Sequence, residues 1–333
     1  MIEAHFGESP PLSLGVEEEL MILDAETLAP AAAVGVLVAG AEELDLPGTL
    51  KTELHASVVE LNTRVCATVD EAVDALRVLR RAADGIARAN GLRLAAAGAH
   101  PTAALESLPV VQEERYLQMI ERFGRAARRQ GVNGLHVHVG VESGEQCWER
   151  LEAVLPWLPA VLAVSANSPF VDGEVTGMLS NRAGILAELP RAGPPPAFGG
   201  YDAWAAWVER LTALRVIEDH TRIWWDIRPN PRFGTLELRI ADQPTALERT
   251  ALVLELLRRL VAEAPPAAAD RGVYLQNRWS AARYGIDAEL VHPDGNRIVT
   301  ARDLLGDDLP EPEAFAQLRA DDVAADLVAR TVA

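Results

Sequence analysis

Acidic and imidazole side chains recur at alternate positions within short apolar segments of this 333-residue sequence. The segment GVEEEL carries Glu17 and Glu19, and the segment LHVHV carries His136 and His138. Successive side chains of a β-strand point to opposite faces, so residues two apart share a face. Each pair is therefore predicted to form the polar face of a strand whose other face is apolar.

Two further segments repeat this alternation. VVELN places Glu60 and Asn62 on one face, and LELRI does the same for Glu237 and Arg239. Any one of these strands alone fits an ordinary amphipathic strand with its polar face in water. Four of them in one chain indicate a shared polar cavity, provided that they line the same one.

The donor types indicate which cation such a cavity would hold. Carboxylate oxygens in this number suit Mg²⁺ or Mn²⁺, which prefer oxygen ligands and tolerate one imidazole among them. A zinc site would use more histidine or cysteine, and the sequence contains neither an HExxH motif nor a CxxC pair.

Arginines gather around one proline-rich segment, IWWDIRPNPRFGTLELR. Guanidinium forks match carboxylate and phosphate oxygens. Arg228 and Arg239 alternate onto the polar face of the two strands, whereas Arg232 fits a solvated surface position equally well. Lys51 is the only lysine, and no Walker A motif is present. If the protein uses ATP, arginines and metal ions must hold its phosphates.

The order of the expected elements favours the α+β class with a mainly antiparallel sheet, because strands and helices mix without regular alternation. Strands are expected over 12–23, 58–63, 92–98, 135–141, 223–227 and 235–240. Helices are expected over 70–90, 113–130, 148–166, 202–216 and 247–263, with helical segments and loops after them. The GPPPAFGG stretch is interpreted as a loop inside one domain, so residues 1–333 are expected to form a single catalytic domain.

Charge and composition exclude several partners. The formal net charge is -18, which disfavours nucleic acid and anionic membranes. No apolar run reaches the roughly 18 residues of a membrane span, and the start lacks signal-peptide features. A cytoplasmic protein is therefore expected, with Cys66 and Cys147 as reduced thiols that have no catalytic duty.

Six segments together resemble one known family. In order they are LGVEEEL, ELHASVVELNT, GLHVHVGV, SANSPF, IWWDIRPNPRFGTLELRIAD and NRWSAARYG. This series, from about Leu14 to Tyr284, resembles the bacterial glutamate–cysteine ligase type 2 family of carboxylate–amine ligases, distant relatives of glutamine synthetase. The resemblance implies a glutamine synthetase-like catalytic fold, in which a curved, mostly antiparallel sheet carries helices on its outer face and holds ligands on its concave face.

The resemblance also implies roles for individual residues. The metal ligands are expected to be Glu17, Glu19, Glu53, Glu60, His136 and Glu237. The catalytic arginines are expected to be Arg239 and Arg228. Substrate or nucleotide contacts are expected from Arg182, Asn167, His138 and Arg232. His138 has no counterpart among the ligands of the wider superfamily and is expected beside them. Taken alone, SANSPF favours a simple turn around Asn167 over a ligand contact.

The implied activity is an ATP- and Mg²⁺-dependent ligase, with Mn²⁺ as an alternative metal. It would activate a glutamate-like γ-carboxylate as an acyl phosphate and pass it to an amine such as that of cysteine. The expected partners are therefore amino-acid substrates and ATP, and a homodimer is a family-level expectation. Two alternatives stay open: a metal-dependent amide hydrolase that uses the same carboxylate and histidine face, and a non-catalytic protein that binds glutamate or a nucleotide.

Overall fold

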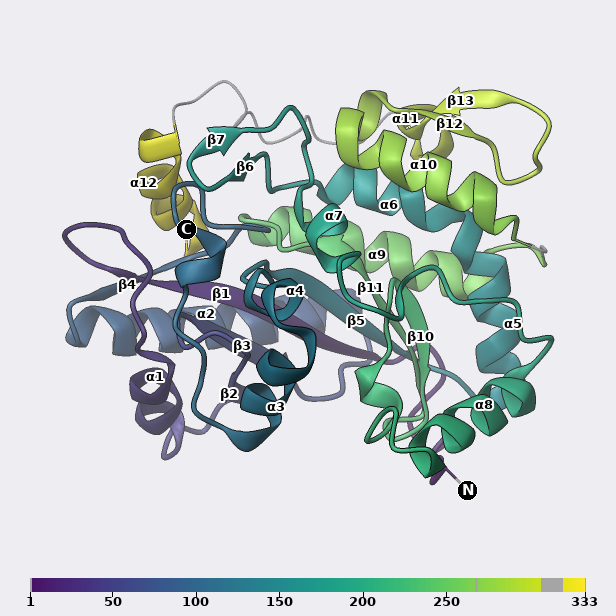
Figure 1. Cartoon of the computed structure of the whole chain (residues 1–333), viewed down its shortest axis with the longest axis horizontal. Helices are drawn as coiled ribbons and strands as arrows, with labels where there is room; N and C mark the ends of the chain where they lie inside the picture. Colours follow the sequence, from purple (N-terminus) through teal and green to yellow (C-terminus); the bar gives the residue numbers. More distant parts are fainter. Residues whose placement is uncertain (1, 267–268, 307–319, 333) are drawn as a thin grey trace.

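The computed structural model describes residues 2–266, 269–306 and 320–332, and it is built on one seven-stranded sheet (Figure 1). The strands of this sheet are β1 (Leu14–Asp24), β2 (Gly48–Thr52), β3 (Val58–Thr63), β4 (Leu92–Ala95), β5 (Gly134–Gly140), β10 (Ile227–Asn230) and β11 (Thr235–Asp242). Their order is β10-β11-β5-β1-β3-β2, with β4 paired to the end of β1, and every ladder is antiparallel. The expected α+β class with an antiparallel sheet is confirmed.

Helices and three short strand pairs complete the chain. The helices are α1 (Val34–Ala41), α2 (Val69–Ala89), α3 (Glu114–Phe123), α4 (Arg125–Arg128), α5 (Gly144–Val154), α6 (Leu158–Ser165), α7 (Arg182–Leu186), α8 (Tyr201–Ala213), α9 (Leu247–Glu263), α10 (Arg271–Tyr284), α11 (Ala301–Leu305) and α12 (Ala320–Thr331). The small pairs are β6 (Phe170–Val171) with β7 (Glu174–Val175), β8 (Ala192–Gly193) with β9 (Trp224–Trp225), and β12 (Glu289–Val291) with β13 (Ile298–Thr300).

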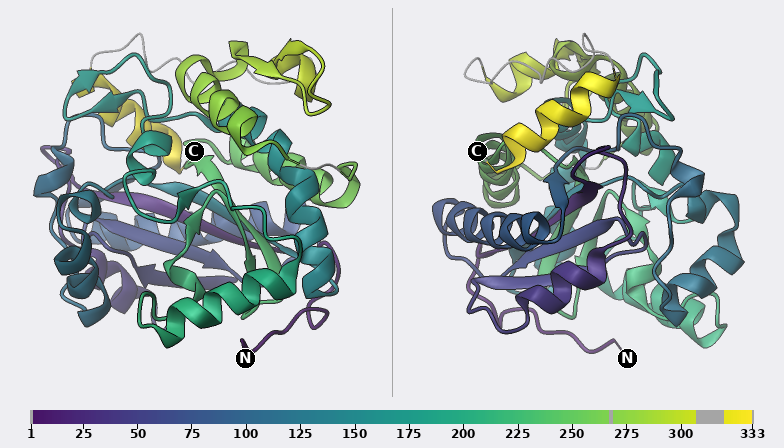
Figure 2. Two further views of the ribbon diagram at one scale, coloured as in Figure 1. Left: turned by 45° about the vertical axis from the view of Figure 1, so that its right-hand side comes forward. Right: turned by 90° about the vertical axis from the view of Figure 1, so that its left-hand side faces the viewer.

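The apolar face of the sheet packs against helices that lie along it (Figure 2). Val16, Val137 and Leu238 from three neighbouring strands join one core cluster with Leu76 of α2 and Leu254 of α9. All five are at most 1% exposed. Burial of this side leaves the other side of the alternation, with its acids and histidines, facing away from α2 and α9.

Glu18 is the exception on the apolar face, and its charge is matched there by an arginine of α2. Arg80 donates to both Glu18 carboxylate oxygens from its Nε and Nη2 atoms, at 2.7 Å each. Arg80 Nη1 also donates to the carbonyl oxygens of Thr245 at 2.6 Å and Thr331 at 2.8 Å. The ion pair is completely buried, with exposures of 1% and 0%. It ties β1, α2, the segment after β11 and the end of α12 together.

Two expected helices are interrupted in the structure. The stretch predicted over 113–130 divides into α3 and α4 at Gly124, whose φ of 56° is incompatible with a continuing helix. The stretch predicted over 148–166 is divided by a 3₁₀ turn, Leu155–Trp157, which contains Pro156. Proline removes a backbone donor, and its ring clashes with the preceding turn of a helix.

The proline-rich turn is shorter than expected, because β10 continues through Pro229 to Asn230. β10 is an edge strand paired only with β11, so a residue without an N–H is tolerated there. The hairpin β12–β13 was not foreseen in a region expected to be helical with loops, and neither were α1 and β2. Residues 307–319 of that region lie outside the described part. Among the described residues, no helix combines the length and apolar character needed to cross a membrane.

Candidate functional site

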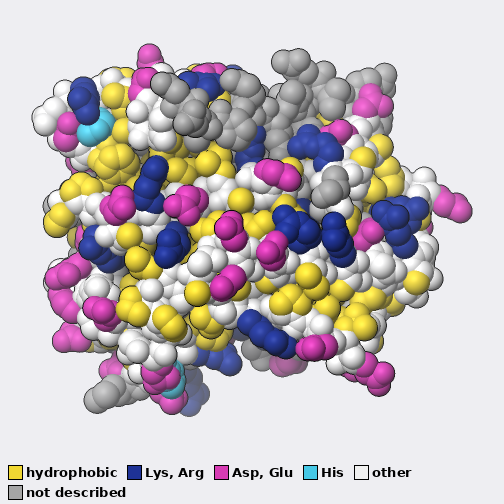
Figure 3. Space-filling model, turned by 180° about the vertical axis from the view of Figure 1, so that it is seen from behind, with side chains coloured by type: hydrophobic (Ala, Val, Ile, Leu, Met, Phe, Trp, Pro, Cys, Tyr) yellow, Lys and Arg dark blue, Asp and Glu magenta, His cyan; other side chains and the backbone are white. Residues whose placement is uncertain are grey.

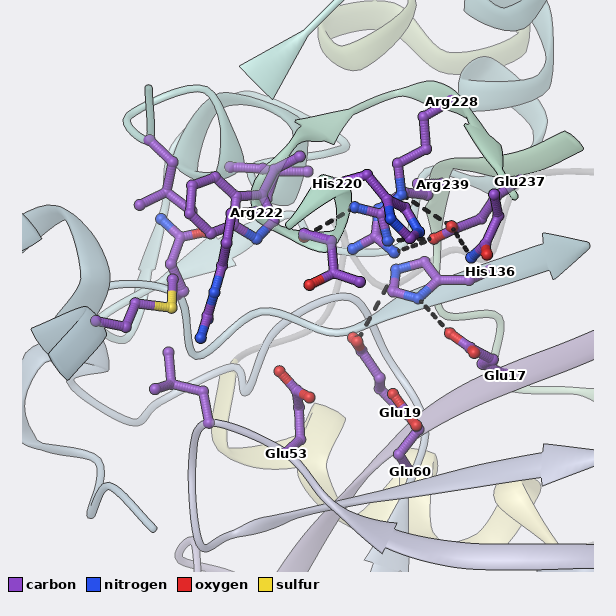
Figure 4. A pocket seen from close by; sticks show the side chains of 18 of the residues that line it. Glu17, Glu19, Glu53, Glu60, His136, His220, Arg222, Arg228, Glu237 and Arg239 are labelled. Carbon is purple, nitrogen blue, oxygen red and sulfur yellow. Dashed lines mark hydrogen bonds and ion pairs between the residues drawn. The ribbon is translucent and has the colours of Figure 1, made fainter. Parts of the chain in front are cut away.

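A cavity of about 490 Å³ lies over the polar face of the sheet. It is lined by every residue expected to ligate metal, act in catalysis or bind substrate except Asn167: Glu17, Glu19, Glu53, Glu60, His136, His138, Arg182, Arg228, Arg232, Glu237 and Arg239. In Figure 4 the acids Glu17, Glu19, Glu53 and Glu60 lie along one side, and Glu237 lies with Arg228 and Arg239 on the other. The cavity therefore has an acidic side, formed by Glu17, Glu19, Glu53 and Glu60, and an arginine-containing side, formed by Arg228 and Arg239 with Glu237.

The register of β1 determines which polar side chains become neighbours. Glu17 stands opposite His136 of β5 and opposite Asn62 of β3, while Glu19 stands opposite Glu60. Directly opposed residues of antiparallel strands have Cβ atoms roughly 5 Å apart. Acids and imidazoles that are far apart in the sequence are therefore brought within reach of one another.

The next strands extend this row. His138 of β5 stands opposite Glu237 of β11, which in turn stands opposite Arg228 of β10. His138 is held by Thr235, whose Oγ1 lies 2.9 Å from the ring Nδ1 atom. The row therefore changes from acids at β1 and β3 to an arginine at the edge strand β10.

His136 lies between the carboxylate of Glu17 and the guanidinium of Arg182. Its Nδ1 lies 3.2 Å from Glu17 Oε2, so this nitrogen must carry the proton that is donated to the carboxylate. Burial first, and then the charge of Arg239, lower the pKa of His136 to about 3. The ring is therefore neutral at ordinary pH. Its Nε2 lone pair stays free of a proton, and Arg182 Nη2 lies 3.4 Å away.

Glu17 is ionised, whereas three neighbouring acids hold their protons more tightly. Burial opposes the charge of Glu17, but hydrogen bonds to His136 and His138 outweigh it and lower its pKa. Burial and the charge of Glu53 raise the pKa of Glu19 to about 7. Burial raises the pKa of Glu53, and burial with Glu17 and Glu53 raises that of Glu60 well above 4.5.

These carboxyls fit a hard divalent cation chemically. Oxygen donors dominate, and a buried carboxyl whose pKa is raised by its neighbours regains its charge most easily beside a cation. In the part of the chain that the structure describes, no three His, Cys, Asp or Glu side chains are drawn together closely enough to form a ready-made metal-binding group.

Divalent cation binding is expected to strengthen with pH. Below the Glu19 pKa of about 7 a cation must displace the proton of Glu19, so affinity should rise by up to about tenfold per pH unit there and level off above it. Titration of the protein with Mg²⁺ or Mn²⁺ at pH 6, 7 and 8, followed by calorimetry, measures this slope. An affinity that is constant over this range would contradict the assignment, and Glu19→Gln should flatten the slope.

The stability of the metal-free protein should change in the opposite sense. The folded-state pKa of Glu19 is about 7, above its ordinary value of 4.5, so the native state binds the extra proton. Its contribution is present below pH 4.5 and is lost as the pH rises through 7. Thermal unfolding with a chelator present should show this decline, and added divalent cation should remove it.

Glu237 is fully occupied by donors. Arg228 approaches both of its oxygens, from Nε at 2.8 Å and from Nη2 at 3.0 Å. Asn230 Nδ2 donates to Oε2 at 2.9 Å, and Arg239 Nη1 donates to Oε1. An ionised carboxylate has about four lone-pair positions. All four are taken in this arrangement, so Glu237 could ligate a metal only if a donor moved away.

The two arginines beside Glu237 stabilise its ionised form. Burial opposes ionisation of Glu237, but Arg228 and Arg239 outweigh it and hold its pKa well below 4.5. Arg228 also donates to the carbonyl oxygens of Thr221 and Ile223, and this fixes its orientation. Two cations share one anion here, which leaves a net positive charge beside the acid row.

Arg182 reaches the cavity from α7, through space that a glycine leaves open. Its Nη2 donates to the carbonyl oxygen of Arg239 at 3.1 Å, and its Nη1 to that of Ile240 at 3.3 Å. A Cβ added at Gly134 would lie only 2.1 Å from Arg182 Nη2. Any side chain at Gly134 would therefore displace the guanidinium from His136.

Asn167 does not line the cavity. Its side-chain amide donates to the carbonyl oxygen of Gln243 at 2.9 Å and to Thr245 Oγ1 at 3.1 Å, and it is 4% exposed. The amide of Asn167 therefore stabilises the segment after β11 and is not directed at a ligand. This agrees with the alternative interpretation of SANSPF as a simple turn. Arg232 lies at the cavity wall, but its side chain is exposed and lies over the ring of Phe233. The structure is therefore also consistent with a solvated surface position for Arg232.

The cavity also contains residues that the sequence did not single out. Asn230, which completes the shell of Glu237, follows Arg228 by two positions in β10, and this alternation could have indicated it. Lys51 faces Glu60 across β2 and β3 and donates to Asn62 at 3.0 Å. Tyr116 lies on α3 without any pattern in the sequence to mark it.

Comparison with known proteins identifies the family of this chain. The model of glutamate-cysteine ligase family 2 matches residues 13–326. A Rubrobacter xylanophilus protein with the provisional name glutamate–cysteine ligase 2-3 is 40% identical over 303 residues, covering 90% of this chain and 83% of that protein. A Rhodospirillum rubrum protein, provisionally named glutamate–cysteine ligase 2, is 36% identical, with coverages of 89% and 79%.

Two solved structures share the fold at low sequence identity. The bifunctional glutathione synthetase of Pasteurella multocida superposes with a TM-score of 0.63 at 14% identity, covering 96% of this chain and 48% of that one. The glutamate–cysteine ligase of Francisella tularensis, in complex with AMP, gives 0.61 at 13%, with coverages of 97% and 84%. The expected glutamine synthetase-like fold is thus confirmed. Because the family model matches most of this chain and a relative with the same family name is 40% identical to it, this chain belongs to glutamate–cysteine ligase family 2.

Proposed function

We propose that the protein is an ATP-dependent carboxylate–amine ligase that uses Mg²⁺ or Mn²⁺. The acid is a glutamate-like γ-carboxylate, and the amine is that of cysteine or a related compound. One observation carries this proposal: a row of acids and a pair of arginines anchored by one glutamate face each other across a single cavity. Membership of the ligase family supports the same reaction class.

The acid row would hold the cations. Glu17, Glu19, Glu53, Glu60 and the Nε2 atom of His136 supply the donors for this role. When bound, the cations would neutralise repulsion between the nucleotide phosphates and the substrate carboxylate. Glu237 joins this set only if an arginine exchanges for the metal, and in the described arrangement it anchors Arg228 and Arg239.

The arginines would act on the phosphoryl group. A carboxylate oxygen of the acid attacks the γ-phosphorus, the bond to the β-phosphate breaks, and ADP leaves. Arg239 and Arg228, held in place by Glu237, stabilise charge on the phosphoryl oxygens during this transfer. Their orientation is set before the substrate binds, so little reorganisation is needed at the moment of reaction.

The second step would join the amine. Its nitrogen attacks the acyl carbon, the C–O bond to phosphate breaks, and the nitrogen loses a proton. No covalent bond to the protein is needed. Cys66 and Cys147 are buried, and burial raises the pKa of both thiols, so neither is poised as a nucleophile.

The test is ADP release measured together with product mass. The protein is incubated with ATP, Mg²⁺, L-glutamate and a panel of amines that includes L-cysteine. ADP that forms only when acid and amine are both present, together with a condensed product, is the expected result. Cleavage of an amide with metal alone and no nucleotide turnover would instead identify a hydrolase. Tight ligand binding without ADP release for any pair would identify a binding protein.

A further inference from the structure

A second, smaller cavity of about 180 Å³ adjoins the acid-lined one. The two share wall residues, including Arg115, Arg222 and Trp224. Figure 4 shows Arg222 on the side of the main cavity away from Glu17 and Glu237. A molecule bound at the acid row could therefore extend into the smaller cavity without leaving the protein.

Four arginines line this smaller cavity, which we call the arginine pocket: Arg115, Arg122, Arg191 and Arg222. Glu218 is the only acid among its lining residues, and it pairs with Arg222 at 2.8 Å. The pocket therefore carries an excess of positive charge, in a chain whose formal net charge is -18. Such a concentration of guanidinium groups attracts anions.

Arg191 is the most distinctive of the four. It is half-buried, and its backbone φ of 62° lies in the left-handed region. Its guanidinium carbon lies 5.4 Å from the ring centre of Trp224 and 5.9 Å from that of Phe123. Within the described residues, no Asp or Glu forms an ion pair with it. Burial and the charge of Arg122 lower its pKa.

Arg122 is the second arginine of the pocket that forms no ion pair with a described residue, and its guanidinium donates to the carbonyl oxygen of Val216. Arg191 Nε donates to the carbonyl oxygen of Arg222 at 3.0 Å, and an anionic ligand would pair with its remaining N–H donors. On the face seen in Figure 3, by contrast, Lys and Arg side chains stand interspersed with Asp and Glu. Arg115 and Arg222 pair with Glu113 and Glu218, so Arg191 and Arg122 are the pocket arginines that have no carboxylate partner within the described part of the chain.

We propose that the arginine pocket binds the carboxylate of the amine substrate, so that the protein selects amino acids over simple alkylamines. This inference rests on the proposed ligase function. The amine of such a substrate lies toward the acid-lined cavity, and its carboxylate contacts Arg191 and Arg122. A nucleotide phosphate has the same charge chemistry, and the experiment separates these two sources.

The test compares matched amines that differ only in the carboxylate. L-Cysteine is paired with cysteamine, and glycine with methylamine. The parent protein should prefer the amino acid of each pair by roughly tenfold or more in kcat/KM, since hydrogen bonds to charged groups are strong. Arg191→Gln and Arg122→Gln should each raise KM for the amino acids and leave the alkylamines unchanged. The preference should therefore shrink.

The control is Arg128→Gln, an exposed arginine of α4 outside both cavities. It should leave every constant unchanged. An undiminished preference for amino acids in both pocket variants would overturn the proposal. A raised KM for ATP with an unchanged KM for amino acids would assign the pocket to a phosphate instead. Because Arg122 is exposed, its variant remains informative if Arg191→Gln folds poorly.

Failure of the proposed function gives a different result. If no acid and amine pair is turned over, binding of L-cysteine and cysteamine can still be compared by saturation-transfer NMR. Binding of L-cysteine that is lost in Arg191→Gln, with cysteamine unaffected, would support the pocket independently of catalysis. Equal binding of both compounds to the parent and the variant would refute it.

Discussion

Glu60→Gln is expected to lower ADP formation by ~10³-fold or more while leaving the metal-free protein at least as stable as its parent. Burial, Glu17 and Glu53 raise the pKa of Glu60 well above 4.5, so its carboxyl is disposed to be neutral without a cation. An amide is then a close substitute, and Asn62 can keep its donor contact at Oε1. The same amide is a far weaker cation ligand than a carboxylate.

The measurement pairs an ADP assay at saturating Mg²⁺ with thermal unfolding in chelator. Glu174→Gln, an exposed position away from the cavity, serves as the control and should change neither quantity. Retention of activity in Glu60→Gln would remove this residue from the metal-binding set. A large loss of stability would show that the carboxylate is needed for folding instead.

Arg80→Ala is expected to destabilise the protein by about 3–5 kcal/mol, because it leaves Glu18 buried and unpaired. The total stability of such proteins is only roughly 5–15 kcal/mol. The substitution also removes a donor from the carbonyl oxygen of Thr331 at the end of α12. Urea unfolding measures the change, and Arg81→Ala on the exposed side of α2 is the matched control.

A second variant separates charge from packing. In Arg80→Met with Glu18→Leu, the buried charge and its partner are removed together. Replacement of a buried ion pair by apolar residues is often nearly neutral, so much of the lost stability should return. If the double variant is no more stable than Arg80→Ala, packing and the carbonyl contacts of Arg80 dominate over the unpaired charge.

The cavity could be anticipated because strand alternation is local. Glu17 and Glu19 share one face of their strand because they are two positions apart, and the same alternation places His136 and Glu237 on the polar faces of their own strands. The apolar neighbours of each residue indicate which face is buried. The pairing of these strands is not local. It depends on the register of β1 with β3 and β5, which only the structure gives; the resemblance to a family implied no more than a common ligand-binding face.

Other features depend on contacts that no short pattern encodes. The occupied lone pairs of Glu237 result from Arg228, Asn230 and Arg239 converging in three dimensions. Asn167 has a residue type suited to ligands, but its amide is used by the chain itself. The arginine pocket collects side chains from α3 and from the segments around β8 and β9, so no periodicity marks it.

The alternation of β1 has a consequence for how this protein can change. Three consecutive acids serve opposite sides: Glu17 and Glu19 face the cavity, and Glu18 faces Arg80 in the core. A one-residue insertion or deletion inside the strand would exchange these sides, burying two unpaired charges and exposing one. β1 should therefore accept substitutions but no change in length, and variation in length among descendants of this chain should be confined to its loops.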